Sequence, residues 1–119
     1  MATHNELGIK GEEIAVEFLE KNSYRILERN WRFKKAEVDI IAFKKGVLAV
    51  AEVKTRSSNY FGDPQDFVNQ KKIQLLVEAI NEYVISKNLD VEVRFDIIAI
   101  TKNQEKFEIK HLKDAFFYF

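Results

Sequence analysis

The sequence predicts a fold of the α/β type, in the α+β arrangement, in which helices pack against a mixed sheet. Five short segments are rich in alternating or continuous apolar residues, as strands require. Two longer segments instead repeat apolar residues at helical spacing. The predicted order is α-β-β-β-α-β-β, and three strands followed by a helical crossover to a further strand imply a mixed sheet.

The first predicted helix covers residues 5–22, with Asn5 as its N-cap. One arc of this helix is apolar and holds Leu7, Gly11, Ile14, Ala15, Phe18 and Leu19. Glu12 lies on the flank of that arc, where a carboxylate is unfavourable unless it meets a partner. The simpler interpretation of Glu12 is a boundary residue that reaches water.

Residues 24–33 are predicted to form the first strand, and residues 37–55 a β-hairpin that turns at Lys45-Gly46. If Lys44 and Val47 close a two-residue turn, the register of the whole hairpin follows from them. The remaining predicted elements are a loop over residues 57–65, a helix over 66–87, strands over 91–101 and 106–111, and an aromatic C-terminal segment, 112–119, compatible with a short helix.

This register brings charged residues together at one end of the hairpin. Asp39 falls opposite Glu52, and Glu37 falls opposite Lys54, all on one face because residues two apart on a strand share a face. The opposite face is apolar and carries Val38, Ile40, Ala42, Ala49, Ala51 and Val53. Opposed carboxylates repel each other unless a cation lies between them. That cation is either a metal ion or, in a purely structural cluster, Lys54 and a nearby arginine.

Composition limits the classes of function. The 119 residues suit one domain, residues 1–119, and no apolar run approaches the ~20 residues of a membrane span. The absence of cysteine excludes disulfides and thiolate metal sites and fits a cytoplasmic protein. The formal net charge is zero, so contact with nucleic acid requires a local basic patch.

The carboxylates and the lysine at the end of the hairpin match the needs of metal-assisted phosphodiester hydrolysis. Mg²⁺ takes oxygen ligands, commonly one or two carboxylates with waters and a substrate phosphate. Asp39 and Glu52 are the expected ligands, with the backbone carbonyl of Val53 as a further one. Lys54 would stabilise charge on the reacting phosphate. Lys72 also stands out, because its ammonium group falls within the apolar arc of the second helix and needs an anionic partner or a path to water.

Six short motifs occur in order along the chain: G-x-x-G-E at Gly8–Glu12, N-W-R at Asn30–Arg32, E-V-D at Glu37–Asp39, E-V-K-T-R at Glu52–Arg56, F-G-D-P at Phe61–Pro64 and R-F-D at Arg94–Asp96. With this set the chain resembles the uncharacterised UPF0102 family, also called YraN-like, of the PD-(D/E)XK nuclease superfamily. At the level of core motifs it is also similar to archaeal Holliday-junction resolvases.

The resemblance implies a restriction-endonuclease-like α-β-β-β-α-β core and an endonuclease that depends on Mg²⁺ or Mn²⁺. Asp39, Glu52 and Lys54 correspond to the nuclease motif, Glu12 to the glutamate of the first helix, and Lys72 to a basic position in the second helix. Val38 stands where the superfamily usually has proline. The implied substrate is DNA, branched DNA included, and such a substrate would suit a homodimer.

Basic residues around this motif are candidates for nucleic-acid binding, namely Arg32, Arg56, Lys71 and Lys72, together with a wider rim of Lys34, Lys35, Lys44 and Lys45. Each is individually compatible with an ordinary solvated charge. His4 and His111 are interpreted as surface or core-edge residues and Trp31 as a core residue. Two alternatives to an enzyme stay open: a non-catalytic nucleic-acid-binding or adaptor module with the nuclease fold, and an interaction protein that docks through its aromatic C-terminus.

Overall fold

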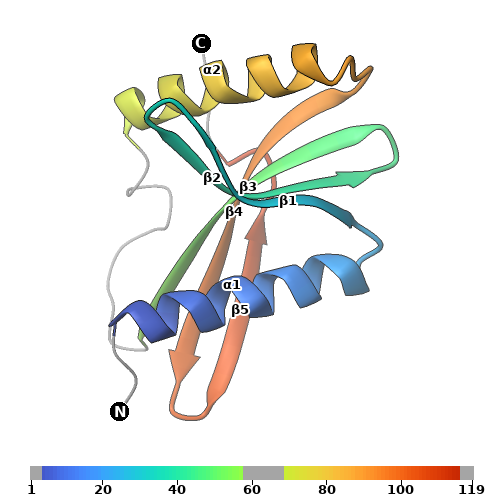
Figure 1. Ribbon diagram of the computed structural model, residues 1–119. Helices are drawn as coiled ribbons and strands as arrows, with labels where there is room; N and C mark the ends of the chain where they lie inside the picture. Colours follow the sequence, from blue (N-terminus) through green and yellow to red (C-terminus); the bar gives the residue numbers. More distant parts are fainter. Residues whose placement is uncertain (1–3, 58–68, 116–119) are drawn as a thin grey trace.

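In the computed structural model, which describes residues 4–57 and 69–115, the elements follow the predicted order α-β-β-β-α-β-β (Figure 1). Their bounds are α1 His4–Lys21, β1 Arg25–Phe33, β2 Ala36–Lys44, β3 Val47–Ser57, α2 Gln70–Ser86, β4 Glu92–Asn103 and β5 Lys106–Leu112. No helix in these described ranges has the length and apolar character needed to cross a membrane.

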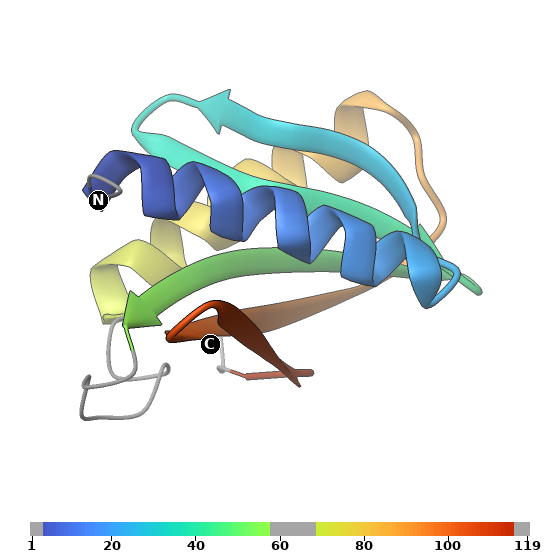
Figure 2. The same cartoon turned by 90° about the horizontal axis from the view of Figure 1, so that it is seen from below.

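The strands form one sheet in the order β1-β2-β3-β4-β5. All neighbours are antiparallel except β3 and β4, which run parallel because α2 carries the chain back between them. Figure 2 shows α1 crossing in front of the strands, with α2 on the far side of the sheet. The predicted mixed sheet flanked by helices is therefore confirmed.

Each helix covers its own apolar cluster. Beneath α2 the cluster contains Val38, Ile41, Leu48, Val50, Phe95 and Ile97 with Ile73, Leu76, Ile80 and Tyr83 of the helix. Beneath α1 it contains Ile40, Ala42, Ala49, Ala51, Ile98 and Ile100 with Ala15 and Leu19. Trp31 packs against the first cluster and meets the ring of Tyr83 edge-on at 5.2 Å, which confirms its predicted core position.

The β2–β3 hairpin has the predicted register. Pairing runs from Lys44 with Val47 to Ile40 with Ala51. The turn residues Lys45 and Gly46 have φ values of 48° and 80°, the left-handed conformation that two-residue hairpin turns of this kind require. The ladder stops immediately before Asp39 and Glu52, so the two strands diverge where the carboxylates begin.

The predicted alternation of faces is wrong at one point in β2. Val38 lies in the cluster beneath α2, whereas Ile40 lies in the cluster beneath α1, although residues two apart share a face in a regular strand. Asn30 on the neighbouring β1 adopts φ 51° at the same level, between the pairs Arg29–Ile40 and Trp31–Val38. Such local distortions redirect a side chain, and here they occur at Asp39.

Three predicted boundaries change. Asn5 lies inside α1, which already begins at His4, so the predicted N-cap is wrong. In α2 the N-cap is Asn69, whose Oδ1 accepts a hydrogen bond from the backbone N–H of Lys72 at 2.8 Å. The predicted start of that helix at residue 66 and most of the predicted loop fall outside the described residues. Leu112 ends β5 and a turn follows it, so no helix begins there, and residues 116–119 also fall outside.

Gly11 allows α1 to lie directly on β3. A Cβ atom built on Gly11 would collide with Oγ1 of Thr55. The glycine therefore has a packing reason, as its predicted place on the apolar arc suggested. It brings the next residue, Glu12, against the diverging ends of β2 and β3.

Candidate active site

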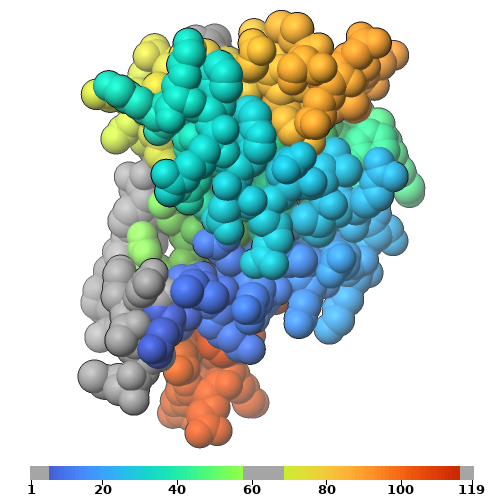
Figure 3. Space-filling view, in the orientation of Figure 1, coloured from blue at the N-terminus to red at the C-terminus, as the bar shows by residue number. Residues whose placement is uncertain are grey.

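A pocket of about 520 Å³ opens where β2 and β3 diverge. It is lined by Leu7, Gly8, Ile9 and Glu12 of α1, Asp39 of β2, residues 53–56 of β3, and Lys72 of α2. In Figure 3 the green atoms of β3 are recessed between the blue of α1, the teal of β2 and the yellow of α2. The pocket thus collects side chains from four elements that are distant in the sequence.

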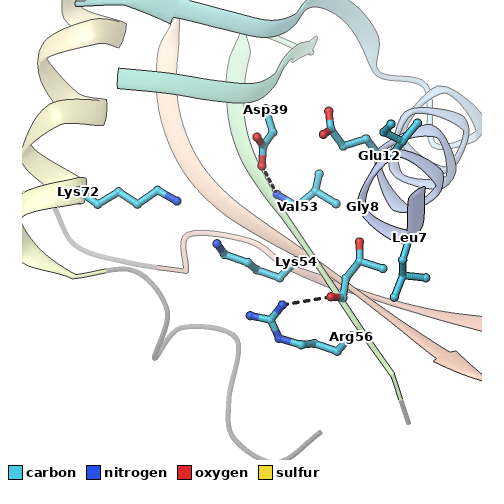
Figure 4. Close-up of a pocket in the computed structure, with 10 residues that line it drawn as sticks. Leu7, Gly8, Glu12, Asp39, Val53, Lys54, Arg56 and Lys72 are labelled. Atoms are coloured by element: carbon cyan, nitrogen blue, oxygen red, sulfur yellow. Dashed lines mark hydrogen bonds between the residues drawn. The ribbon is translucent and has the colours of Figure 1, made fainter. Parts of the chain in front are cut away.

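Asp39 and Glu52 face each other across the divergence and are connected through the backbone. Oδ2 of Asp39 accepts a hydrogen bond from the backbone N–H of Val53 at 2.8 Å (Figure 4). The backbone N–H of Asp39 donates to Oε2 of Glu52 at 3.4 Å. These side-chain hydrogen bonds replace the strand pairing that ends at Ile40, and they fix the position of both carboxylates.

Lys72 reaches Glu52 from α2 and forms an ion pair of 2.9 Å between Nζ and Oε1. Glu52 is only 1% exposed, so its charge requires such a partner. Burial alone would lower the pKa of Lys72, but the Glu52 and Asp39 carboxylates together outweigh that effect and raise it. The ion-pair partner of Glu52 is therefore Lys72, not the Lys54 and nearby arginine of the structural alternative, and the ammonium group in the apolar arc has its anion.

Asp39 and Lys54 are both shifted toward their neutral forms. Burial, followed by the negative charge of Glu52, raises the pKa of Asp39 to about 6. Burial, followed by the nearby ammonium of Lys72, lowers the pKa of Lys54. Oppositely perturbed groups in one cleft are typical of functional sites.

Glu12 points from α1 into the same pocket as Asp39 (Figure 4). Burial, followed by the charge of Asp39, raises the pKa of Glu12. Its Oε1 is shielded from solvent and has no hydrogen-bond partner within residues 4–57 and 69–115. The interpretation of Glu12 as a residue that reaches water therefore fails for this oxygen, which needs a donor or a cation.

The donor set suits a hard divalent cation. Mg²⁺ commonly binds through one or two carboxylates and keeps several waters, and Asp39 and Glu52 supply carboxylates beside the unsatisfied Oε1 of Glu12. In the part of the chain that the structure describes, no three acidic or histidine side chains are grouped closely enough to enclose an ion by themselves. Waters or substrate oxygens would have to complete the coordination.

The other predicted site residues are spread more widely. Arg56 lines the pocket, whereas Lys71 is exposed on α2 and is absent from its lining. Arg32 forms an exposed ion pair of 2.7 Å with Glu37. The β2–β3 ladder ends before Glu37, so its predicted pairing with Lys54 is wrong, but Glu37 still lies with Asp39, Glu52 and Lys72 around a neighbouring pocket of about 300 Å³. Val53 lines the pocket and donates its N–H to Asp39.

A second buried charge network lies near the other end of α1 and was not predicted. Asp96 is fully buried and accepts hydrogen bonds from Arg94, from the backbone N–H of Asp114 at 3.0 Å and, at 2.8 Å, pairs with Nε2 of His111. Arg94 also donates to the hydroxyl of Tyr24 at 2.7 Å. Burial would raise the pKa of Asp96, but the hydrogen bonds from His111 and Arg94 outweigh it and lower the pKa.

This network explains residues that the sequence left without a role. His111 is largely buried, with its side chain 9% exposed, and belongs to the network rather than to the surface. The signal in the sequence was the pair Arg94 and Asp96, two apart on a strand and therefore on one face. The network connects β4, β5 and the start of β1, and it contributes no side chain to the pocket.

The opposed charges at Asp39 predict an unusual effect on stability. Replacing Asp39 with asparagine should increase the free energy of unfolding at pH 7 by about 1–3 kcal/mol, because it removes a buried charge beside Glu52 and keeps an acceptor for Val53 N–H. The pKa of Asp39 rises from 3.8 to about 6 on folding, so the native state holds this proton more tightly. The stability of the wild-type protein therefore decreases as the pH rises from 3.8 to about 6. The stability advantage of Asp39→Asn over wild type should grow over the same rise in pH.

Urea unfolding at pH 4, 5, 6 and 7 measures this difference. Asp90→Asn is the matched control, because Asp90 is exposed after α2 and should show no such growth. A less stable Asp39→Asn protein at pH 7 would show that the Asp39 charge holds the fold together, as in a purely structural cluster.

Comparison with known proteins gives one consistent result. The sequence model of the uncharacterised protein family UPF0102 matches residues 11–100. A UPF0102 protein of Flavobacterium psychrophilum is 61% identical over 119 residues, covering all of both chains. Another from Christiangramia forsetii is 63% identical over 119 residues, again covering both chains completely. A more distant one from Bacteroides thetaiotaomicron is 45% identical over 117 residues, which cover 98% of this chain and 97% of that protein. The chain belongs to the UPF0102 family.

Proposed function

We propose that this protein is a nuclease that uses Mg²⁺ or Mn²⁺ to hydrolyse phosphodiester bonds in DNA. The observation that carries the proposal is the convergence of Asp39, Glu12, Lys54 and Lys72 at one pocket, with the buried Glu52 directly behind it in contact with Asp39 and Lys72. Buried carboxylates without enough cations are unfavourable for a fold, and this arrangement becomes favourable when a divalent ion is present.

Each residue then has a distinct task. Asp39 and Glu52 would hold the ion, with Val53 as a further backbone ligand. A bound divalent ion polarises the phosphate and makes a water molecule more acidic. Glu12 would accept a hydrogen bond from the attacking water, since its Oε1 lacks another partner. An entering phosphate would favour the charged form of Lys54, which would then stabilise the negative charge that develops in the transition state.

The wider basic residues would hold the rest of the DNA. Arg56 lines the pocket beside Lys54, and the exposed Lys71 and Arg32 lie outside it. They would contact phosphates further along the strand and make binding dependent on salt concentration. Branched DNA is a candidate substrate on the motif resemblance to resolvases, and a two-fold homodimer would match its symmetry.

One observation favours a second candidate function. Lys72 already neutralises Glu52 at 2.9 Å, without a metal ion. A protein that had lost catalysis could keep this ion pair as part of a structural network and bind nucleic acid without cleaving it. In that case divalent ions should have no specific effect on the protein.

The response to divalent ions separates the two candidates. We expect Mn²⁺ or Mg²⁺ at ~10 mM to raise the melting temperature, because an ion that binds only the folded state stabilises it by RT ln(1 + [L]/Kd). Asp39→Asn should lose most of this increase, whereas Asp90→Asn should keep it. Cleavage of linear, flapped and four-way DNA across the same titration tests the activity itself. An unchanged melting temperature together with intact DNA would favour the binding module.

A further inference from the structure

The pocket has two chemically different walls. Lys54 and Arg56, two apart on β3, provide a cationic wall. The first turns of α1 provide the other wall, with Leu7, Gly8 and Ile9. Ile9 is 54% exposed, so it offers apolar surface at the edge of the charged pocket. Figure 4 shows Leu7 and Gly8 on one side of β3 and Lys54 and Arg56 on the other.

Gly8 marks free space in this wall. A Cβ atom built on Gly8 would meet no described atom within 4 Å, in contrast to Gly11, which is held against Thr55. Glycine inside a helix destabilises it by roughly 0.5–1 kcal/mol relative to alanine. Close packing explains the glycine at position 11 but not the one at position 8. Gly8 lies one turn before Glu12, on the same side of the helix and facing the same pocket.

We propose that the Leu7–Gly8–Ile9 wall is a subsite for the nucleoside of one unpaired DNA nucleotide, whose phosphate lies against Lys54 and Arg56. This inference rests on the proposed function and restricts its substrate to DNA with an unpaired nucleotide at the cleavage position, such as a flap, a frayed end or a branch point.

Three features support this occupant. A nucleotide has a charged phosphate and an apolar base face, in the same arrangement as the two walls. The pocket volume of about 520 Å³ falls within the range of roughly 300–1,000 Å³ that encloses a small ligand. A base stacked and paired in a duplex cannot present its face to a protein wall, so the base must first leave the stack. Contact with a base face tolerates any sequence, so we expect little sequence preference.

The test fills the free space at Gly8 and measures binding without a divalent ion. The probes are a fluorescent single-stranded dT decamer and a blunt duplex of equal length. Gly8→Leu should weaken decamer binding by roughly 5-fold, the lower end of the loss when a base loses an aromatic platform, because aliphatic contacts are weaker, and change duplex binding much less. Gly8→Ala should raise the melting temperature, since alanine favours the helix and meets no described atom. Gly11→Ala should lower it, because its methyl group collides with Thr55.

Ile9→Asn removes an apolar contact from an exposed position and carries the test if Gly8→Leu does not fold. Its matched control is Ile85→Asn on α2, where the isoleucine is 68% exposed and absent from the pocket lining. Selective loss of decamer binding in Ile9→Asn, but not in Ile85→Asn, supports the subsite.

Other results overturn the subsite and identify which proposal fails. If wild-type protein binds and cleaves DNA and both pocket variants bind the decamer normally, the subsite is wrong and the proposed nuclease stands. Equal losses for decamer and duplex would also refute it, because the wall would then not distinguish unpaired nucleotides. If wild-type protein neither binds nor cleaves any of the DNA probes, the proposed function fails and the subsite with it. Tighter binding of an rU decamer would assign the wall to RNA instead of DNA.

Discussion

Replacing Lys54 with alanine is expected to lower DNA cleavage by roughly 10²–10³-fold, the loss seen when one preorganised electrostatic stabiliser is removed. The interaction of Lys54 with the reacting phosphate strengthens as negative charge develops, so it acts mainly on the transition state. DNA affinity should fall much less, because one phosphate contact among several contributes modestly to binding. In a module that only binds DNA, the same change would weaken binding and reduce its salt dependence.

Single-turnover cleavage and DNA affinity should be measured on one substrate with one protein preparation. Lys71→Ala is the matched control, since Lys71 is exposed on α2 and does not line the pocket. It should affect binding slightly and the cleavage rate at saturating protein hardly at all. Undiminished cleavage by Lys54→Ala would indicate a contaminating nuclease and refute the proposed activity.

Replacing Asp96 with alanine is expected to destabilise the fold by about 3–5 kcal/mol, the usual effect of removing one member of a buried ion pair. Asp96 is fully buried and is the common partner of Arg94, His111 and the Asp114 backbone. Without it, the guanidinium of Arg94 keeps only the Tyr24 hydroxyl as a hydrogen-bond partner among residues 4–57 and 69–115. A loss of this size can exceed half the stability of a small domain.

Urea unfolding measures this effect, with Asp90→Ala as the exposed control. The pH dependence should be opposite to that of Asp39. The pKa of Asp96 is lowered from 3.8 on folding, so its contribution is fully present above that pH and is lost as the pH falls further. If Asp96→Ala were as stable as the control, the network would contribute nothing measurable to the stability of the fold.

The sequence predicted the carboxylate hairpin well because its constraints are local. The Lys45-Gly46 turn fixes the register as far as Ile40 and Ala51, and Asp39 and Glu52 follow directly, connected by the Asp39 N–H that donates to Glu52 Oε2. Glu12 was recognisable because a carboxylate beside an apolar arc requires a reason. Lys72 was recognisable on the same ground, and its pairing with Glu52 supplies that reason.

The failures of prediction all involve tertiary contacts. The face of Val38 depends on a distortion shared with Asn30 of a different strand, which no pattern within β2 reveals. Glu37 pairs with Arg32 because β1 lies on the other side of β2. The role of His111 depends on β5 lying beside β4, so that Asp96 is within reach. Periodicity identifies the elements, but it does not specify which side chains of distant elements meet.

The parallel pairing of β3 with β4 has a consequence for the order in which the molecule assembles. Residue 47 pairs with residue 92, so the partners lie 45 positions apart along the chain, whereas the β2–β3 hairpin closes across a two-residue turn. Hairpins form in about 1–10 μs, while contacts between distant segments must first overcome the entropy of closing a long loop. We therefore expect Asp39 and Glu52 to meet early, in an intermediate stage that still lacks Lys72 and the Asp96 network. Their mutual repulsion would then slow folding, and if the proposed divalent ion already binds at this stage, it would accelerate folding by relieving that repulsion.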